Sequence, residues 1–235
     1  NFTVNKGDIL GITGLLGSGR TEIALSLFGL NPPDSGEVLI ENKPVKLSSP
    51  AEAMKHGIAL LPEDRLSQGL FLESSTKTNI TVTILDKLKS SLGIVDKNKE
   101  KEISINTVKD VNVNNKNIDL HVKKLSGGNQ QKIVLGKWMV TDPKLFILDT
   151  PTVGVDIGSK SEIYEKIQES AAKGMGIIII SDEIEEILAN CNKAIIMHEG
   201  KIAEYLDEKG LNDEDAQDRI FNIINNPLGR VNHEV

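Results

Sequence analysis

The residues Gly14-Leu15-Leu16-Gly17-Ser18-Gly19-Arg20-Thr21 decide the fold of this chain. The apolar run Ile9 to Ile12 before them predicts a buried strand, and Glu22 to Phe28 after them predict a helix that ends at Gly29. Strand, glycine-rich loop and helix in this order are the setting of a phosphate-binding loop. Glycines let backbone N–H groups turn inward around phosphate oxygens, and the helix N-terminus adds partial positive charge. We therefore expect residues 14–21 to hold a phosphate, with the Thr21 hydroxyl on Mg²⁺.

One position of this loop departs from the usual pattern, because Arg20 stands where such loops carry Lys. A planar guanidinium cannot take the place of a compact ammonium between phosphates, so the exchange is not conservative. Backbone amides supply much of the cradle. We expect phosphate binding to survive the exchange.

Composition excludes several classes of protein. The 235 residues include 27 basic and 34 acidic side chains, for a net charge of −7, and only 3% are aromatic, which argues against nucleic-acid binding. A single cysteine, Cys191, excludes an internal disulfide framework and fits a reducing cytoplasm. No apolar run approaches the ~20 residues of a membrane span. The chain starts at Asn1 without a secretory pattern, and we interpret it as a piece of a longer polypeptide.

The order of predicted elements indicates an α/β fold with a central, mostly parallel sheet, an antiparallel edge region and an inserted helical subdomain. We expect one domain over residues 1–210, with the insertion at about 69–128, and then a C-terminal helix and tail over 211–235. The expected strands are 37–40, 45–47, 58–61, 145–148, 177–180, 194–197 and 201–205, and we expect the last two to be edge strands. The expected helices follow a capping box at Ser49-Pro50-Ala51-Glu52 and then cover 78–88, 97–111, 160–172 and 183–189.

Ligands of such sheets bind at the carboxyl ends of the strands. The phosphate loop, Glu63, Asp149 and Asp182 all follow predicted strands directly. We therefore expect these residues to meet at one edge of the sheet.

A second motif, Ser126-Gly127-Gly128-Asn129-Gln130-Gln131, follows Leu125 and precedes the strand that ends at Asp149. Taken alone, it predicts a helix N-cap with flexible glycines. Together with the phosphate loop, Asp149-Thr150-Pro151-Thr152 and Gly154-Val155-Asp156, it resembles the ATP-binding domain of ABC transporters. The resemblance extends from Phe2 to Tyr205.

Finer features are similar to the second ATPase half of simple-sugar (ribose/galactose-type) importer ATPases, which carry two such domains in tandem. These features are Gly11-Ile12-Thr13-Gly14, Pro62-Glu63-Asp64-Arg65 and Ser126 to Lys132.

The resemblance implies that two domains face each other head to tail, with each ATP between one phosphate loop and the other domain's Ser-Gly-Gly loop. It implies that Thr21 and Asp149 hold Mg²⁺. The residues implied in nucleotide binding are Gly14, Leu15, Leu16, Gly17, Ser18, Gly19, Arg20, Thr21, Ser126, Gly127, Gly128 and Gln130. Family members also stack adenine on an aromatic side chain upstream of the phosphate loop. Phe2, the only aromatic residue there, is too close to the loop in sequence to serve, so we expect this platform in residues outside this piece of the polypeptide or in none.

The positions that carry catalysis in the family are altered here. Thr150 stands where a Glu positions the attacking water, Asp182 stands at the switch His, and Glu63 stands at a Gln. We expect these changes to cost ~10²–10⁴-fold in rate. The alternative is relocated chemistry, with Asp182 or Glu63 as the base.

These observations predict the ATP-binding component of an importer for a simple sugar or nucleoside, on the cytoplasmic face of the membrane. We expect this domain to be the degenerate half of a tandem pair whose Ser-Gly-Gly loop completes the other half's site. The expected partners are that half, membrane-spanning permease subunits and, indirectly, a solute-binding protein, with no nucleic acid. Two alternatives stay open, a non-hydrolysing regulatory nucleotide-binding module and a soluble ABC ATPase outside transport.

Overall fold

The computed structural model describes residues 1–90 and 93–225. Within these ranges six strands form the main sheet, in the order β4-β5-β6-β1-β7-β8. Every neighbouring pair is parallel except β7 and β8. The strands are β1 (Ile9–Gly14), β4 (Ile58–Leu61), β5 (Leu145–Asp149), β6 (Gly176–Ile180), β7 (Lys193–His198) and β8 (Lys201–Leu206). The prediction of a mostly parallel central sheet is confirmed.

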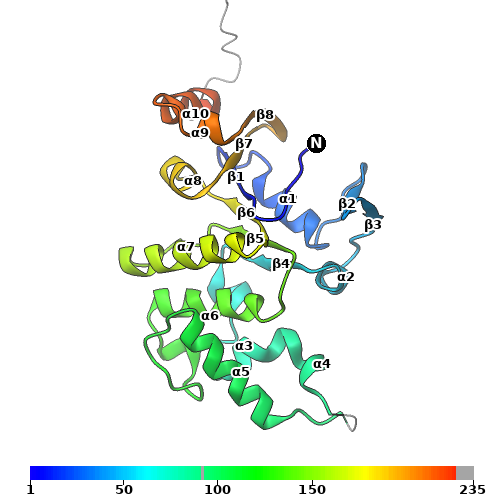
Figure 1. Cartoon of the computed structure of the whole chain (residues 1–235), viewed down its shortest axis with the longest axis vertical. Helices are drawn as coiled ribbons and strands as arrows, with labels where there is room; N and C mark the ends of the chain where they lie inside the picture. Colours follow the sequence, from blue (N-terminus) through cyan, green and yellow to red (C-terminus); the bar gives the residue numbers. More distant parts are fainter. Residues whose placement is uncertain (91–92, 226–235) are drawn as a thin grey trace, which may run out of the picture.

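Helices cover both faces of this sheet (Figure 1). Isoleucines of β6 show the two-sided burial: Ile177 and Ile179 join one apolar cluster, and Ile178 and Ile180 join the other. A strand buried on both faces has a continuous apolar sequence, which explains the run of four isoleucines. The helices outside the insertion are α1 (Arg20–Leu27), α2 (Pro50–Lys55), α6 (Gly127–Met139), α7 (Ile157–Ala172), α8 (Ile184–Asn190), α9 (Glu208–Leu211) and α10 (Ala216–Asn225).

A small hairpin, β2 (Val38–Ile40) and β3 (Lys43–Val45), stands apart from the main sheet. Its two-residue turn is Glu41-Asn42, and both residues have positive φ, 52° and 60°. Such a turn matches the twist of the flanking strands, so the second strand begins at once. The predicted second strand, 45–47, was therefore placed two residues too late.

The helical insertion forms the lower end of the molecule in Figure 1. The helix predicted over 78–88 is broken into α3 (Thr76–Thr81), the 3₁₀ turn η2 (Val82–Ile84) and α4 (Leu85–Leu88). β-Branched residues and side chain–backbone bonds compete with a continuous helix here: the Thr83 hydroxyl donates to the carbonyl of Lys137 on α6. The next helix, α5 (Lys97–Asp110), forms nearly as predicted and packs with α3 against α6.

Three smaller expectations have clear outcomes. The expected capping box forms only in part: the Ser49 hydroxyl accepts from the Glu52 amide at 3.3 Å, but the Glu52 carboxylate accepts from Lys55 at 2.7 Å. The prediction that 194–197 forms an edge strand is wrong, because β7 lies between β1 and β8. The predicted single helix of the C-terminal tail is preceded by the short α9, and residues 226–235, the predicted frayed end, lie outside the described residues.

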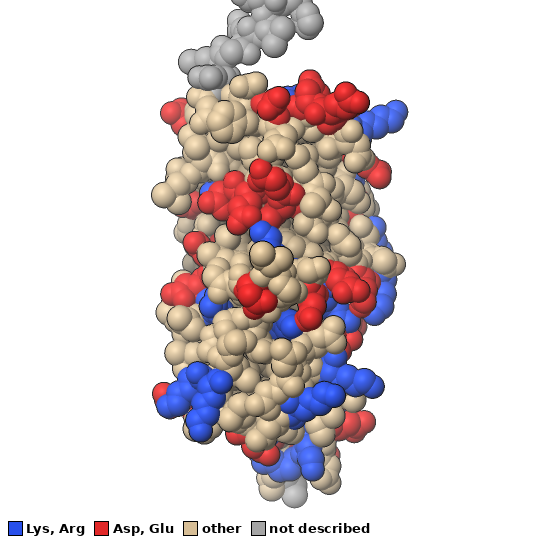
Figure 2. Space-filling model, turned by 90° about the vertical axis from the view of Figure 1, so that its left-hand side faces the viewer, with Lys and Arg blue, Asp and Glu red and all other residues tan. Residues whose placement is uncertain are grey.

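Charge is divided unevenly between the insertion and the rest. Residues 69–128 contain ten lysines and seven acidic residues, although the whole chain carries −7. Lysines gather over the lower end in Figure 2, whereas acidic side chains dominate the face above it. None of the helices in the described ranges is long and apolar enough to cross a membrane.

Candidate functional site

The candidate site lies where β1, β4, β5 and β6 end, because these parallel strands share one carboxyl edge. β1 delivers the phosphate loop, β4 delivers Glu63, β5 ends at Asp149 and β6 leads to Asp182. The expectation that these residues meet at one sheet edge therefore holds at the level of topology.

The phosphate loop has the backbone of an anion-binding cradle. Gly17 and Gly19 have φ of 79° and 97°. Gly19 directly precedes α1 and provides no side-chain cap, so no capping side chain accepts hydrogen bonds from the first amides of this helix. A Cβ on Gly14 would lie 2.3 Å from the Met197 carbonyl oxygen, which excludes any side chain there. Within the described residues the buried Ser18 hydroxyl has no hydrogen-bond partner. Free donors in a closely turned backbone are what a phosphate group requires.

Asp149 is the centre of a group of polar side chains. It is buried at the end of β5, and Thr21, Thr150, Glu63 and Arg20 are all close enough to act on its ionisation. Burial and the Glu63 carboxylate raise the pKa of Asp149, while the Thr21 and Thr150 hydroxyls and the Arg20 guanidinium lower it, and the rise prevails. The structure thus brings together residues that are far apart in sequence.

This group fits a magnesium ion. A carboxylate and a hydroxyl are hard oxygen ligands, and Mg²⁺ commonly takes one or two protein ligands and completes its shell with phosphate and water. No group of three or more His, Cys, Asp or Glu residues that could hold a metal ion occurs in the described ranges. Thr21 and Asp149 are the residues that would hold the ion. When bound, it would neutralise charge on the phosphate oxygens.

Thr150 has an unusual backbone, with φ of 48°. Positive φ in a β-branched residue is sterically costly, by about 1–3 kcal/mol. Its amide donates to the Ile180 carbonyl at 2.9 Å and its hydroxyl donates to Asp149 Oδ1 at 3.3 Å. Its hydroxyl is therefore directed at the carboxylate. Glu63 and Asp182, the other two altered positions, are exposed.

The Ser126-Gly127-Gly128 loop opens α6 and stands apart from the phosphate loop: among the described residues no hydrogen bond joins the two. The Ser126 hydroxyl serves as N-cap and accepts from the Asn129 side-chain amide at 2.8 Å. Gln130 is buried and donates to the Val122 carbonyl at 3.2 Å, so its side chain is directed into the protein. The N-cap expected from the sequence is confirmed. The roles of these residues toward nucleotide stay predictions.

Two residues near the site were missed as functional candidates. Glu186 on α8 is 4% exposed, and its carboxylate accepts from the hydroxyls of Thr152 and Ser181, each at 2.5 Å, and pairs with Lys160 at 2.6 Å. It thereby joins the loop after β5 to the loop after β6. Arg65 lies half-buried beside the loop after β5. A helical Glu in an acidic run gives no sequence signal for such burial.

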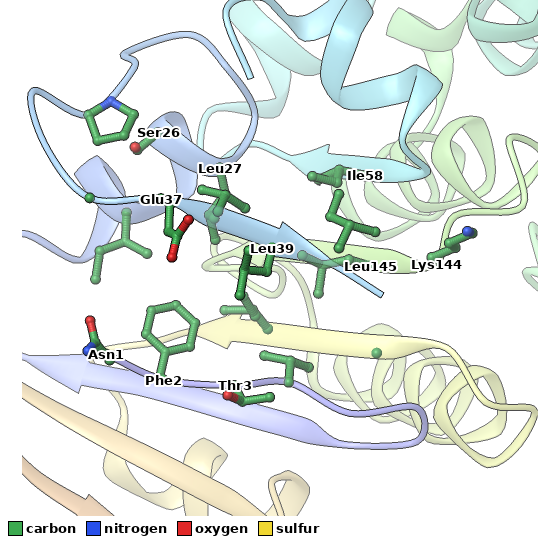
Figure 3. A pocket seen from close by; sticks show the side chains of 18 of the residues that line it. Asn1, Phe2, Thr3, Ser26, Leu27, Glu37, Leu39, Ile58, Lys144 and Leu145 are labelled. Atoms are coloured by element: carbon green, nitrogen blue, oxygen red, sulfur yellow. The ribbon is translucent and has the colours of Figure 1, made fainter. Parts of the chain in front are cut away.

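A large groove has the residues labelled in Figure 3 among its lining residues, and Asp149 is not one of them. It extends from Gly19 to the amino ends of β4 and β5 at Ile58 and Leu145, and has a volume of about 2280 Å³. Phe2 stands in it between the N-terminal segment and β2. The aromatic residue that precedes the phosphate loop in sequence therefore lines the same groove as Gly19.

Known proteins resemble this chain in sequence and in fold. Residues 1–153 match the family model described as ABC transporter. The chain is 45% identical over 214 residues to a ribose import ATP-binding protein RbsA of Geobacillus kaustophilus, covering 91% of this chain and 43% of the relative. It is 39% identical over 209 residues to a putative ribose/galactose/methyl galactoside import ATP-binding protein 1 of Burkholderia cenocepacia, covering 89% and 40%. The chain thus spans less than half the length of these relatives.

Solved structures share the fold. A nucleotide-free ATP-binding cassette from an ABC transporter superposes with a TM-score of 0.78 at 24% identity, covering 94% of this chain and 90% of that one. The cbiO1 protein of Clostridium perfringens, part of the ABC transporter complex cbiONQ, gives 0.77 at 24%, covering 95% and 86%. With a phosphate loop, a strand-end Asp149 and a Ser-Gly-Gly helix start on this fold, the chain belongs to the ABC transporter family.

Proposed function

We propose that this chain is an ATP-binding domain of an importer for a simple sugar of the ribose or galactose type, or for a nucleoside. The observation that carries the proposal is the glycine-rich loop, with φ of 79° and 97° at Gly17 and Gly19, at the same sheet edge as the buried Asp149. The names of the relatives, which refer to ribose and galactose import, support the choice of solute class.

In this proposal the amides of residues 14–21 hold the ATP phosphates, and Thr21 and Asp149 hold Mg²⁺. Arg20 supplies positive charge in place of the usual Lys. The 14–21 cradle and the oxygen ligands support binding. The exchange of the water-positioning Glu for Thr150 supports slow or absent turnover at this site, because a threonine hydroxyl is a far weaker base than a carboxylate.

The Ser126–Gly128 loop would then serve the site of a partner domain, the other half of a tandem pair. Large apolar side chains exposed around the site loops support such a partner. Leu16 in the phosphate loop is 97% exposed, and Ile157 at the start of α7 is 89% exposed. Single exposed apolar residues are common, but Leu16 on the phosphate loop and Ile157 at the start of α7 would both face the partner in the head-to-tail arrangement.

We place the domain on the inner face of the cell membrane, beside membrane-spanning permease subunits that receive solute from a binding protein. The excess of lysines over the helical insertion favours approach of that end to anionic lipid headgroups. Leu66 within the Arg65–Gly69 turn and Phe71 just after it are 48% and 56% exposed and offer an apolar contact to a permease.

A second candidate is a regulatory module that binds ATP and never hydrolyses it. The substitutions at Arg20, Glu63, Thr150 and Asp182 favour it. Phosphate release by a tandem protein in which only this half is competent separates the two: release above background supports slow catalysis, and none supports the regulatory module.

The first test is calorimetric titration of the chain with ATP, with and without Mg²⁺. Saturable micromolar binding that Mg²⁺ strengthens is the expected result, and Thr21→Ala should weaken the Mg²⁺-dependent part. No binding in either condition would contradict the cradle. In the tandem protein, Thr150→Glu should raise turnover and Ser126→Ala should lower it; if neither changes turnover, the asymmetric pair is wrong.

A further inference from the structure

Arg65 occupies a position between three segments that are distant in sequence. It begins the π-helical turn η1 (Arg65–Gly69), which follows β4 and Glu63. Its Nη1 donates to the Val153 carbonyl at 2.8 Å, and its Nη2 donates to the Gly154 carbonyl at 3.3 Å. The planar guanidinium thus holds two consecutive carbonyls of the loop between β5 and α7.

The side chain of Asp64 sets the conformation from which Arg65 reaches this loop. It accepts from the amides of Leu66 and Ser67 at 3.0 and 3.2 Å and from the Ser67 hydroxyl at 2.5 Å. The Ser67 hydroxyl and amide hold the pKa of Asp64 below its usual range, so the cap stays ionised at neutral pH. Asp64 and Arg65 therefore act as one unit at the start of η1.

The guanidinium also touches the start of α6. A Cβ on Gly127 would lie 2.9 Å from Arg65 Nη2 and 3.1 Å from the Gly154 carbonyl oxygen. A Cβ on Gly128 would lie 2.0 Å from the Ser159 hydroxyl oxygen. Packing within this chain thus excludes a side chain at Gly128, whereas a side chain at Gly127 would displace the Arg65 guanidinium or crowd the Gly154 carbonyl. The backbone of the Ser126–Gly128 loop, which carries no side chain at its two glycines, packs against Arg65, the loop after β5 and the first turn of α7.

The other end of η1 is fastened to the same helix. The Gly69 carbonyl accepts from Lys137 Nζ of α6 at 2.5 Å, and a Cβ on Gly69 would lie 3.1 Å from the Val134 side chain. η1 therefore contacts α6 near both of its ends, through the close packing of Arg65 at Gly127 and through the hydrogen bond from Lys137 to the Gly69 carbonyl.

We propose that Arg65 is a positioning residue that fixes the Ser126–Gly128 loop relative to the Glu63 turn and the loop after β5. It lies outside the phosphate loop and acts only through the backbone it holds. The packing argument is independent of what the loop binds; the consequence for catalysis rests on the proposed function, in which this loop completes a partner's nucleotide site.

The first experiment measures hydrogen exchange of the whole chain with Arg65→Lys, which keeps the charge and loses the two-pronged donor. The amides of Asn129, Gln130, Val153 and Val155 are hydrogen-bonded in the structure and report on the two loops. Their exchange should become about tenfold faster, and that of the β5 and β6 amides should stay unchanged. Gly127→Ala, which disturbs the same contact from the other side, should give the same pattern.

The matched control is Arg219→Lys, an Arg that pairs with Glu204 in the C-terminal part of the chain. It should leave all four reporter amides unchanged. Exchange that is the same in Arg65→Lys as in wild type would overturn the proposal, whatever the function of the loop.

The second experiment measures ATP turnover by the tandem protein with Arg65→Lys in this half. The kcat of the site that this loop completes should fall at least tenfold with little change in KM, because Arg65 lies outside the phosphate loops. Faster exchange with unchanged turnover would support Arg65 as the positioning residue and would instead contradict the proposed role of the loop.

Discussion

The Thr152 hydroxyl donates to the buried Glu186 carboxylate at 2.5 Å, which joins the loop after β5 to helix α8. Ser181 and Lys160 also donate to the same carboxylate. Removing one member of a buried, hydrogen-bonded charge pair is strongly destabilising, because the remaining donors lose their acceptor. Glu186 therefore links two loops of the candidate site, and its removal is expected to lower the stability of the protein.

We predict that Glu186→Ala lowers the free energy of unfolding by about 3–5 kcal/mol and Glu186→Gln by about 1–3 kcal/mol. Gln keeps the shape and one acceptor, so its loss is smaller. Urea denaturation measures both. The matched control is Glu185→Gln on the exposed side of the same helix, where Glu185 accepts from Gln217, and it should change stability by under ~0.5 kcal/mol. Equal losses at both positions would contradict the buried network.

The Glu186 carboxylate also leads us to predict that the stability of the protein depends on pH in the acid range. Burial alone would raise the pKa of Glu186, but the Lys160 ammonium and the Ser181 and Thr152 hydroxyls outweigh it and hold this pKa below the usual range. Lys160 also pairs with Glu183, and the Tyr164 hydroxyl faces the same site. A lowered folded-state pKa gives stability that is complete above the unfolded value of about 4.3 and is lost as pH falls through the folded value.

The stability difference between wild type and Glu186→Gln should therefore be constant near neutral pH and shrink as pH falls below about 4.3. Urea midpoints between pH 7 and pH 3 give this difference directly. Since both proteins share all other titrating groups, the comparison isolates Glu186. A difference that stays constant to pH 3 would argue against a lowered pKa.

Lys137 predicts a dependence of stability on pH in the alkaline range. Burial lowers its pKa to about 8, and its Nζ donates to the Gly69 carbonyl. Between this value and the ordinary lysine value of about 10.4 the unfolded chain binds more protons, so the Lys137 contribution to stability rises with pH. Relative to Lys137→Met, wild type should gain up to about 3 kcal/mol across this window.

Parallel pH series of wild type and Lys137→Met test this prediction. Burial raises the pKa of Tyr164 and of Cys191, and these groups oppose the rise with pH in both proteins, so only the difference counts. The exposed Lys101→Met serves as the control and should show no such gain. A flat difference for Lys137→Met would mean that the lysine keeps its proton in the folded protein.

We predict that one substitution of Thr150 raises the stability of the protein. Its φ of 48° suits Asn far better than a β-branched residue. Thr150→Asn should raise the free energy of unfolding by about 1 kcal/mol, and Thr150→Val, which keeps the branch and loses the hydroxyl, should lower it. Thermal unfolding gives the order Asn, Thr, Val from most to least stable. A loss of stability with Asn would show that the Thr150 hydroxyl on Asp149 outweighs the backbone strain.

The sequence by itself determined the class of fold and the ends of most strands. The four-isoleucine run of β6 and the apolar run of β4 predict strands that are buried on both faces, because both apolar faces must be shielded from water. The glycines of the phosphate loop and the Ser49 cap act over a few residues, so their conformations are local. The broken 78–88 helix was missed because the Thr83 hydroxyl finds its acceptor on α6, 54 residues away.

Only the tertiary structure decided which polar residues share a site. Asp149 meets Arg20 and Glu63 because parallel strands bring their carboxyl ends to one edge, and Arg65 reaches Val153 across 88 positions. The burial of Glu186 and Lys137 was equally out of reach of the sequence: both stand among ordinary helix formers, and their environment is set by segments that pack against them from elsewhere. Local chemistry fixes the conformation of a loop, whereas the energy of a buried charge depends on every group that surrounds it.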